Sequence, residues 1–238
     1  MSTRVFEVNA DMLMRIDALS MLSESDRVHI ARHCQGYSYG PGDLIVSHHE
    51  SEHDVYFIYE GEIRVTIFAP TGREVTFRDQ GAGEMFGELS AIDREPRSAH
   101  IVARSAVSLI KLDGDTFLRL LNEMSELNLF THRRLAALVR SLSIRVYELS
   151  ALAVRSRVHA EVLRLARAAS EDRRTAIIRP PPKHQEIASL IGTTREAVAR
   201  VFKELKDEQI IDSNHRELRV LSIDALVDLL AGRGGEWI

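Results

Sequence analysis

The chain is most informative between residues 86 and 99, which read Phe86-Gly87-Glu88-Leu89-Ser90-Ala91-Ile92-Asp93-Arg94-Glu95-Pro96-Arg97-Ser98-Ala99. Gly87 permits a close approach of the backbone, and the residues that follow can form one helical turn with free N–H groups for an anion. Glu88 can accept hydrogen bonds from sugar hydroxyls, while Arg97 offers a planar fork of donors for a phosphate and Ser98 adds a hydroxyl. This segment predicts a site for an anionic sugar ligand.

The segment lies in a region, from about residue 34 to 112, that reads as short strands separated by turns. Turn residues such as Pro41-Gly42-Asp43 and Gly81-Ala82-Gly83 interrupt apolar runs such as Val55-Tyr56-Phe57-Ile58-Tyr59. Several short strands at this spacing predict an antiparallel sandwich or barrel. Within residues 63–67, period-2 alternation predicts that Ile63, Val65 and Ile67 share one face, with Arg64 and Thr66 on the other.

Helical periodicity replaces the turns from about Gly114 to Ala153. A seam of residues spaced alternately by three and four positions, with one polar member, comprises Leu135, Leu138, Leu142, Arg145, Leu149 and Leu152. A helix of this length rises about 40 Å, which is more than a small sandwich can cover. The seam therefore predicts a parallel homodimer, and residues 151–153 are the candidate hinge at its end.

Residues 184–205 meet the geometric requirements of a helix-turn-helix. Ile187 and Ile191 are four positions apart, Ala188 is small where two helices must cross, and Gly192 can make the turn. Thr193 or Thr194 can cap the second helix, whose apolar face comprises Val198, Val201, Phe202 and Leu205. Residues 210–212 and 217–221 are then expected to form a small hairpin wing.

Arg195, Glu196 and Arg200 point away from the apolar face of this second helix. The first turns of such a helix enter the major groove, where arginine pairs with guanine and glutamate accepts from cytosine. Two alternatives remain open. Glu196 can complete a capping box with Thr193, and Arg200 can form an ion pair with Glu196 or Glu204 at helical spacing.

Residues 86–99 resemble the phosphate-binding cassette of cyclic-nucleotide-binding domains, and residues 185–200 resemble the recognition element of Crp/Fnr transcription regulators of the cyclic-AMP receptor type. The resemblance covers about residues 15–222. It implies that Glu88 holds the ribose 2′-hydroxyl and that Arg97 holds the cyclic phosphate. Gly87, Leu89 and Ser98 complete the cassette, and Val65 and Phe77 wall the nucleobase. Nine positions separate Glu88 from Arg97, as in cyclic-nucleotide-dependent kinases, one fewer than in the best-known bacterial receptor.

The resemblance also implies that the long helix caps the base through Leu142 and Ser143. Leu142 stands where the bacterial receptor has a hydroxyl-bearing residue, and Ser98 can reach a guanine edge, so both cyclic AMP and cyclic GMP remain open as ligands. On the DNA side, the triplet Arg195, Glu196 and Arg200 implies an inverted repeat of a TGTGA-like half-site. Further DNA contacts are expected from Thr193, Thr194, His184 and Lys203.

Composition limits the possible partners. The chain has 238 residues, 45% hydrophobic and 28% charged, and no apolar stretch of about 20 residues or signal peptide, so we expect a cytoplasmic protein without a membrane partner. Cys34 is the only cysteine, which excludes an internal disulfide, and the pair His48-His49 is not expected to hold a metal. The net charge is −4, yet residues 151–238 hold 15 basic against 13 acidic residues, which is compatible with a local DNA-binding patch.

These observations predict an α+β protein in three parts: a β-sandwich or jelly-roll ligand domain (1–122), a dimerisation helix and hinge (123–153), and a winged helix-turn-helix domain (154–238). The expected partners are a cyclic nucleotide, a palindromic double-stranded DNA operator, a second copy of the chain and RNA polymerase. No metal and no catalytic role are expected. The alternatives are a regulator of the same fold with another effector or none, and a nucleotide-hydrolysing enzyme. The tail from Asp224 to Ile238 receives no role.

Overall fold

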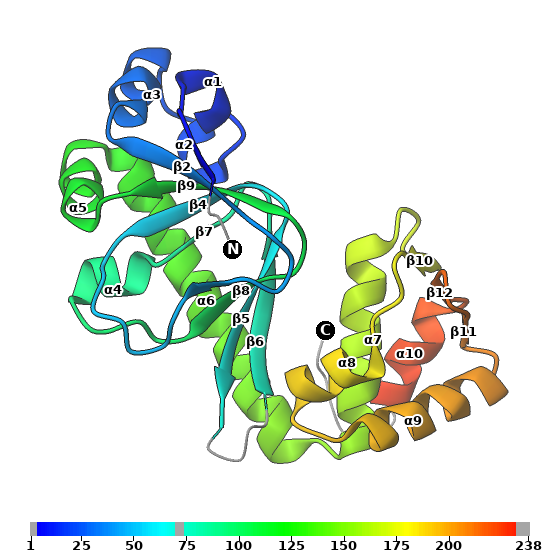
Figure 1. Cartoon of the computed structure of the whole chain (residues 1–238). Helices are drawn as coiled ribbons and strands as arrows, with labels where there is room; N and C mark the ends of the chain where they lie inside the picture. The colour runs from blue at the N-terminus through cyan, green and yellow to red at the C-terminus, as the bar shows by residue number, and fades with distance from the viewer. Residues whose placement is uncertain (1–3, 70–73, 232–238) are drawn as a thin grey trace. The chain divides into compact units, whose positions relative to one another are not determined.

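The computed structural model describes residues 4–69 and 74–231. The chain divides into two compact units, Met1–Val139 and Arg140–Ile238. The boundary falls inside the 27-residue helix α6 (Ser125–Ala151), so each unit is described by itself. Figure 1 labels the helices and strands of both. The Gly-rich end of the tail lies outside the described residues.

The first unit contains two antiparallel sheets. The first has the order β1-β2-β9-β4-β7 and is formed by β1 (Arg4–Phe6), β2 (Cys34–Tyr39), β9 (Val107–Leu112), β4 (Val55–Glu60) and β7 (Met85–Phe86). The second has the order β3-β8-β5-β6 and is formed by β3 (Leu44–Val46), β8 (His100–Ala103), β5 (Glu62–Phe68) and β6 (Glu74–Gly81). The antiparallel architecture predicted for this region is confirmed.

Five short helices accompany these sheets: α1 (Ala10–Leu13), α2 (Asp17–Ser20), α3 (Glu24–Ala31), α4 (Glu88–Asp93) and α5 (Gly114–Glu123). Strand β4 is buried on both faces. Val55 and Phe57 belong to a core cluster with helical residues such as Leu19 and Phe117, whereas Tyr56 and Ile58 belong to a second cluster with residues of β5 and β8. Burial on both faces explains why β4 reads as an unbroken apolar run.

A β-bulge changes the face pattern expected for β5 and β6. Val65 pairs with Arg78 and Thr66 pairs with Thr76, so Phe77 has no partner in the register. The bulge places Thr66 in the interior, fully buried, and the strict alternation predicted for residues 63–67 was wrong at this position. Phe77 is 41% exposed.

The predicted helical region after Gly114 forms two helices, α5 and α6, which are separated at Met124. On α6, four exposed apolar residues follow a spacing of three and four, and we call them the α6 stripe: Val139, Leu142, Val146 and Leu149. The predicted seam shares Leu142 and Leu149 with this stripe. Arg145, the polar member of the predicted seam, is half-buried and forms an ion pair with Glu161 of α7 (Val154–Ala169), and the seam as a dimer interface stays a prediction.

A network of charged side chains joins the end of α6 to α7 within the second unit. Arg145 Nη1 lies 3.3 Å from Glu161 Oε2 and 3.5 Å from Glu148 Oε2, and Arg164 Nη2 lies 2.7 Å from Glu148 Oε1. Glu148 and Glu161 are buried, whereas the side chain of Arg164 is 43% exposed, so these pairs are shielded from solvent on the carboxylate side only. Helix α6 ends at Ala151 and α7 begins at Val154, which places the candidate hinge at the junction that the network spans.

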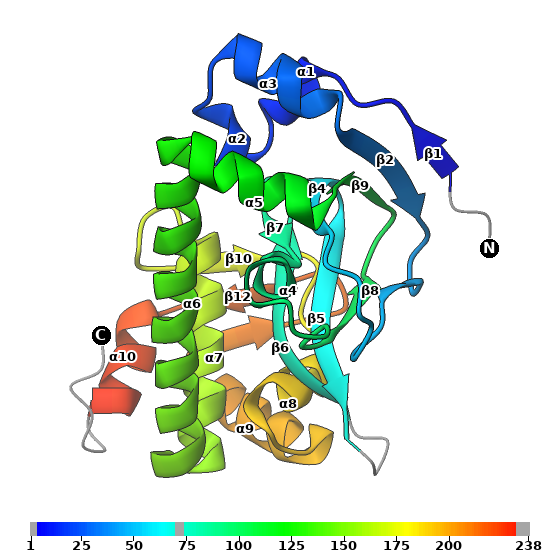
Figure 2. The same cartoon turned by 90° about the vertical axis from the view of Figure 1, so that its left-hand side faces the viewer.

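The second unit is a helical domain with a small three-stranded sheet. After α7 come β10 (Ala176–Ile178), α8 (His184–Ile191), α9 (Arg195–Asp207), β11 (Ile211–Ser213), β12 (Leu218–Val220) and α10 (Ile223–Ala231), with the sheet order β10-β12-β11. Figure 2 shows α8 and α9 next to each other at one end of the domain. One core cluster includes residues of all four helices, among them Val162, Ile187, Val198 and Leu226. The predicted winged helix-turn-helix is confirmed, and α10 is an addition that the sequence analysis left without a role.

Across the described residues, none of the helices is both long enough and apolar enough to span a membrane.

Candidate functional site

A cavity in the first unit is formed where the segment 86–99 faces strands β5, β6 and β8. Its wall comprises Val46, Val65, Arg78, Gln80, Phe86, Gly87, Glu88, Leu89, Ser90, Arg97, Ser98, Ala99 and Ile101. The structure therefore brings together six residues that the sequence analysis proposed for the ligand: Val65, Gly87, Glu88, Leu89, Arg97 and Ser98. Phe77 does not line this cavity, because the bulge leaves it on the exposed side of β6.

Gly87 allows the chain to pass close to the cavity wall. Its φ of +87° lies in the left-handed region, and it directly precedes the short helix α4. A Cβ atom at this position would lie 2.6 Å from the Asp54 carbonyl oxygen and 2.7 Å from Arg97 Nη1. Both the backbone conformation and the close contacts therefore require glycine.

Arg97 is a buried cation, only 4% exposed. Its Nη1 donates to Ser90 Oγ at 2.9 Å, and its Nη2 donates to the Asp54 carbonyl oxygen at 2.8 Å. Its Nε is buried without a hydrogen bond, and Arg97 forms no ion pair with any residue that the structure describes. Burial lowers the pKa of Arg97, but a guanidinium stays protonated in proteins. A buried positive charge without a counter-ion is costly, and an anion in the cavity would offset that cost.

Glu88 supplies a buried carboxylate to the same cavity, with 2% of its surface exposed. Arg134 Nε, from the first-unit part of α6, lies 3.6 Å from Glu88 Oε1, and Arg134 Nη1 lies 3.5 Å from Glu84 Oε1. Arg134 also donates to the Met85 carbonyl oxygen. Within the described chain Glu88 accepts no hydrogen bond, so its oxygens can accept from sugar hydroxyls.

Four residues at or beside the cavity were missed by the sequence analysis: Arg78, Gln80, Ser90 and Arg134. For β6 the sequence pattern indicated the wrong face, because the apolar Val75 and Phe77 are exposed and the alternating polar residues Thr76, Arg78 and Gln80 turn inward. Arg134 gave no local signal, because its partners are about fifty positions earlier in the chain. Leu142 and Ser143 belong to the second unit, and their part in the ligand site stays a prediction.

The described residues contain no group of three or more His, Cys, Asp or Glu side chains that could hold a metal ion.

The second candidate site is the exposed face of α9. Gly192, with a φ of +65°, ends α8, and Thr194 caps α9 by accepting a hydrogen bond from the Ala197 N–H at 3.3 Å. Because Thr194 is the cap, the third helical position is Ala197 and not Glu196. The capping-box alternative for Glu196 with Thr193 is therefore not realised.

The predicted triplet lies on the solvent side of α9. Arg195, Glu196 and Arg200 are all exposed, as is Lys203, while the opposite face is buried in the core. Glu204, the other possible partner of Arg200, is engaged by Arg155 at 2.7 Å. No residue of the triplet forms an ion pair with another described residue, so all three are available to a ligand of this face.

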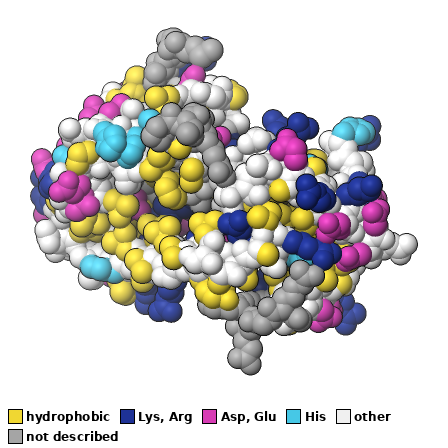
Figure 3. Space-filling view, turned by 90° about the horizontal axis from the view of Figure 1, so that it is seen from below, with side chains coloured by type: hydrophobic (Ala, Val, Ile, Leu, Met, Phe, Trp, Pro, Cys, Tyr) yellow, Lys and Arg dark blue, Asp and Glu magenta, His cyan; other side chains and the backbone are white. Residues whose placement is uncertain are grey.

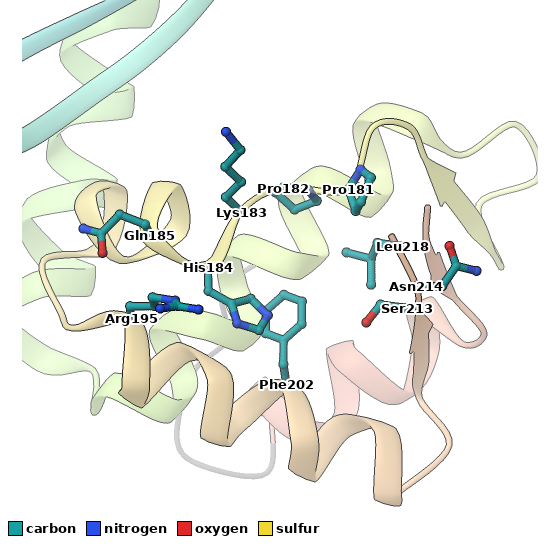
Figure 4. A pocket seen from close by; sticks show the side chains of 10 residues that line it. All are labelled: Pro181, Pro182, Lys183, His184, Gln185, Arg195, Phe202, Ser213, Asn214 and Leu218. Carbon is teal, nitrogen blue, oxygen red and sulfur yellow. The ribbon is translucent and has the colours of Figure 1, made fainter. Parts of the chain in front are cut away.

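The remaining DNA candidates surround the start of α8. Figure 4 shows the His184 ring against Phe202, with Arg195 on one side and the wing residues Ser213 and Asn214 on the other. The His184 and Phe202 ring centroids are 4.7 Å apart. Burial lowers the pKa of His184, and the nearby cations Arg195 and Lys206 lower it further, so the ring is neutral at neutral pH. Figure 3 shows basic and acidic side chains interspersed on the face of the molecule that it presents.

A cavity that holds a buried cation in one unit and an exposed helix-turn-helix in the other together define a class of protein: a DNA-binding regulator with a ligand-binding domain. Comparison with protein families agrees. Residues 37–124 match the cyclic nucleotide-binding domain, and residues 156–229 match the Crp-like helix-turn-helix domain.

Two curated relatives extend the match over most of the chain. The cyclic AMP receptor protein of Thermus thermophilus is 32% identical over 162 residues, which cover 66% of this chain and 70% of that protein. The cAMP-activated global transcriptional regulator CRP of Haemophilus influenzae is 24% identical over 189 residues, or 79% of this chain and 84% of that protein. The chain belongs to the Crp/Fnr family of transcription regulators.

Solved structures share the fold. A CooA variant from Carboxydothermus hydrogenoformans has a TM-score of 0.76 at 18% identity and covers 95% of this chain and 98% of its own. The regulator CLP of Xanthomonas campestris, described as responsive to c-di-GMP, has a TM-score of 0.67 at 20% identity, with coverages of 80% and 95%. The fold is therefore compatible with more than one effector, and the effector must be inferred from the cavity.

Proposed function

We propose that this chain is a homodimeric transcription regulator that binds a cyclic nucleotide, cyclic AMP or cyclic GMP, and in response binds a palindromic, TGTGA-like DNA site. The observation that carries the ligand proposal is Arg97, a buried cation without a counter-ion, in one cavity with the buried carboxylate of Glu88. A cyclic nucleotide presents one anionic phosphate and one ribose hydroxyl, and these match the two groups in charge and hydrogen-bonding capacity.

In this proposal Arg97 and Ser98 bind the phosphate, Glu88 accepts from the ribose 2′-hydroxyl, and Gly87 and Leu89 shape the turn around them. Val65 contacts the base, and Leu142 and Ser143 on α6 cap it. The α6 stripe supports homodimer formation, because four large apolar side chains at heptad spacing are exposed along one helix. A parallel pair of such helices gives the two-fold symmetry that an inverted repeat requires.

For DNA, Arg195 and Arg200 are proposed to donate to guanine and Glu196 to accept from cytosine in the major groove. Thr193, Thr194, His184 and Lys203 lie on or beside the same helix pair and are proposed phosphate contacts. RNA polymerase is the proposed protein partner of the DNA-bound dimer. The closest competing proposal is another effector in the same cavity, since a regulator of the same fold is described as responsive to c-di-GMP.

Titration calorimetry of the purified protein with cyclic AMP and with cyclic GMP tests the ligand, followed by anisotropy with a labelled TGTGA palindrome in the presence and absence of each. We expect one of the nucleotides to bind and to increase DNA affinity. Arg97→Ala should weaken nucleotide binding at least about 100-fold, because a charge-assisted bidentate contact is lost.

Arg94→Ala is the matched control, since Arg94 lies in the same segment but pairs with Asp115 at the surface. Arg97→Ala also leaves Ser90 and the Asp54 carbonyl without their donor, so circular dichroism must show that the variant is folded. Failure of both nucleotides to bind at millimolar concentration would refute the ligand proposal. A DNA affinity that does not change when nucleotide is added would refute the proposed response to the ligand.

A further inference from the structure

Arg78 is a polar group of the cavity that the functions assigned so far do not use. It lies on β6, is half-buried and lines the cavity. It makes no hydrogen bond or ion pair with another described residue. Burial lowers its pKa, and the nearby cation Arg134 lowers it further, while Glu88 and Glu84 act in the opposite direction. A partly desolvated guanidinium with unused donors is suited to acceptors of a bound ligand.

Arg78 and Arg97 occupy different parts of the cavity wall. The charged groups that act on Arg78 are Arg134, Glu88 and Glu84, whereas those that act on Arg97 include Asp54, Glu52 and Glu50. Glu88 is thus among the charges that act on the pKa of Arg78, but it is not among the main charges that act on the pKa of Arg97. A cyclic nucleotide with its phosphate at Arg97 and its ribose at Glu88 would extend its base toward β5 and β6, where Val65 and Arg78 are paired neighbours.

The other polar side chains of the wall are already engaged or belong to the phosphate end. Gln80 Nε2 donates to the Met85 carbonyl oxygen at 3.0 Å. Ser90 Oγ accepts from Arg97, and Ser98 is next to Arg97 in the chain. Arg78 is thus the side chain of the wall best placed to donate to the edge of a base.

On the basis of the proposed function, we propose that Arg78 is a specificity-determining residue that makes the cavity prefer cyclic GMP to cyclic AMP. The O6 and N7 atoms of guanine are both acceptors and match the two parallel donors of a guanidinium. Adenine offers N7 as an acceptor but places an amino donor at position 6, which opposes the second N–H of arginine. The base identity that the sequence left open is therefore assigned by a residue outside the segment 86–99.

Titration calorimetry with cyclic GMP, cyclic AMP and cyclic IMP tests this assignment. Inosine keeps O6 and N7 but lacks the 2-amino group of guanine, so it separates a contact by Arg78 from a contact by Ser98 to the amino group. We expect wild-type protein to bind cyclic GMP and cyclic IMP at least about 5-fold more tightly than cyclic AMP.

Two variants and one control complete the test. Arg78→Ala should weaken cyclic GMP and cyclic IMP and leave cyclic AMP within about 2-fold, and Arg78→Gln should shift the preference toward cyclic AMP, because an amide pairs with N6 and N7 of adenine. Arg64→Ala is the control, since Arg64 lies on the neighbouring strand and is bound by Asp79 at 2.8 Å outside the cavity. It should leave all three affinities unchanged.

The outcomes separate this inference from the proposed function. Equal affinity for cyclic AMP and cyclic GMP, or a ratio that Arg78→Ala does not change, would overturn the role of Arg78 while the cyclic nucleotide site stands. A preference for cyclic GMP over both other ligands would assign selectivity to a 2-amino contact and not to Arg78. Absence of binding by all three nucleotides would overturn the proposed function and this inference with it.

Discussion

At the scale of single residues, Gly87 and Gly42 form a natural pair for testing how the cavity is built. Both have a positive φ, +87° and +84°, but only Gly87 is crowded, whereas nothing lies within 4 Å of a Cβ at Gly42. Gly42→Ala should lower the free energy of unfolding by about 1–2 kcal/mol through its backbone conformation alone. Gly87→Ala should cost more and should also weaken nucleotide binding, because the new methyl group displaces the Arg97 guanidinium.

Urea unfolding and calorimetry with the bound nucleotide measure the two effects. Similar losses of stability in both variants, with unchanged nucleotide affinity, would mean that the contact between Gly87 and Arg97 does not position the guanidinium.

Which site residues the sequence predicted depends on how they reach the cavity. Gly87, Glu88, Arg97 and Ser98 lie on one continuous segment, so residue types and spacing sufficed to place them together. Arg78 reaches the same wall from β6, in a position fixed by strand register and by the bulge that turns Phe77 outward. Sequence reasoning therefore placed this segment, and through the family resemblance Val65, in the cavity wall, whereas the place of Arg78 depended on tertiary structure.

At the scale of elements, the α6 stripe predicts the oligomeric state. Val146 is 64% exposed at the centre of the stripe, so Val146→Glu should place two carboxylates at a parallel helix interface and dissociate the dimer. Ile144 on the same helix is 46% exposed, but it lies about 160° from Val146 around the helix axis and so outside the stripe. Ile144→Glu is therefore the matched control. Sedimentation velocity should show a monomer for the first variant and a dimer for the second. A dimer in both would place the interface elsewhere.

The phase of this stripe shows a limit of sequence reasoning at the element scale. Spacings of three and four along residues 135–152 admit two neighbouring registers, which share Leu142 and Leu149. The predicted seam follows the register through Arg145. In the structure the register through Val139 and Val146 carries the more exposed side chains, and Arg145 forms an ion pair with Glu161 on α7. A partner on another helix gives no signal in the periodicity of α6.

Helix α9 allows base contacts to be separated from phosphate contacts. Arg200 and Lys203 are both exposed cations on this helix. Arg200→Ala should cost about 1–3 kcal/mol at a TGTGA palindrome and relax the preference at one base pair. Lys203→Ala should weaken binding to all sequences alike and reduce the salt dependence. Anisotropy titrations over a set of single-base variants and salt concentrations measure both effects, and a uniform loss in Arg200→Ala would make Arg200 a phosphate contact.

For the whole molecule, the change from alternating strands before Leu112 to helical periodicity after it indicated separate parts, and the sequence predicted three of them, with boundaries after residues 122 and 153. The structure divides into two compact units between Val139 and Arg140, inside a continuous helix. Contacts and not local sequence determine that division: the first half of α6 binds Glu88 through Arg134, and the second half binds α7 through Arg145.

Because one helix connects both sites, ligand and DNA should be thermodynamically coupled. If the nucleotide raises DNA affinity by a given factor, linkage requires that DNA raise nucleotide affinity by the same factor, commonly about 5- to 150-fold. Anisotropy with and without saturating nucleotide gives one factor, and calorimetry of nucleotide binding with and without a saturating palindrome gives the other. Arg134→Ala removes the contact between Glu88 and α6 and should reduce both factors equally. With a scrambled duplex as the control, nucleotide should not change DNA affinity and DNA should not change nucleotide affinity. Unequal factors in the two directions would mean that a further equilibrium, such as dimer dissociation, carries part of the response.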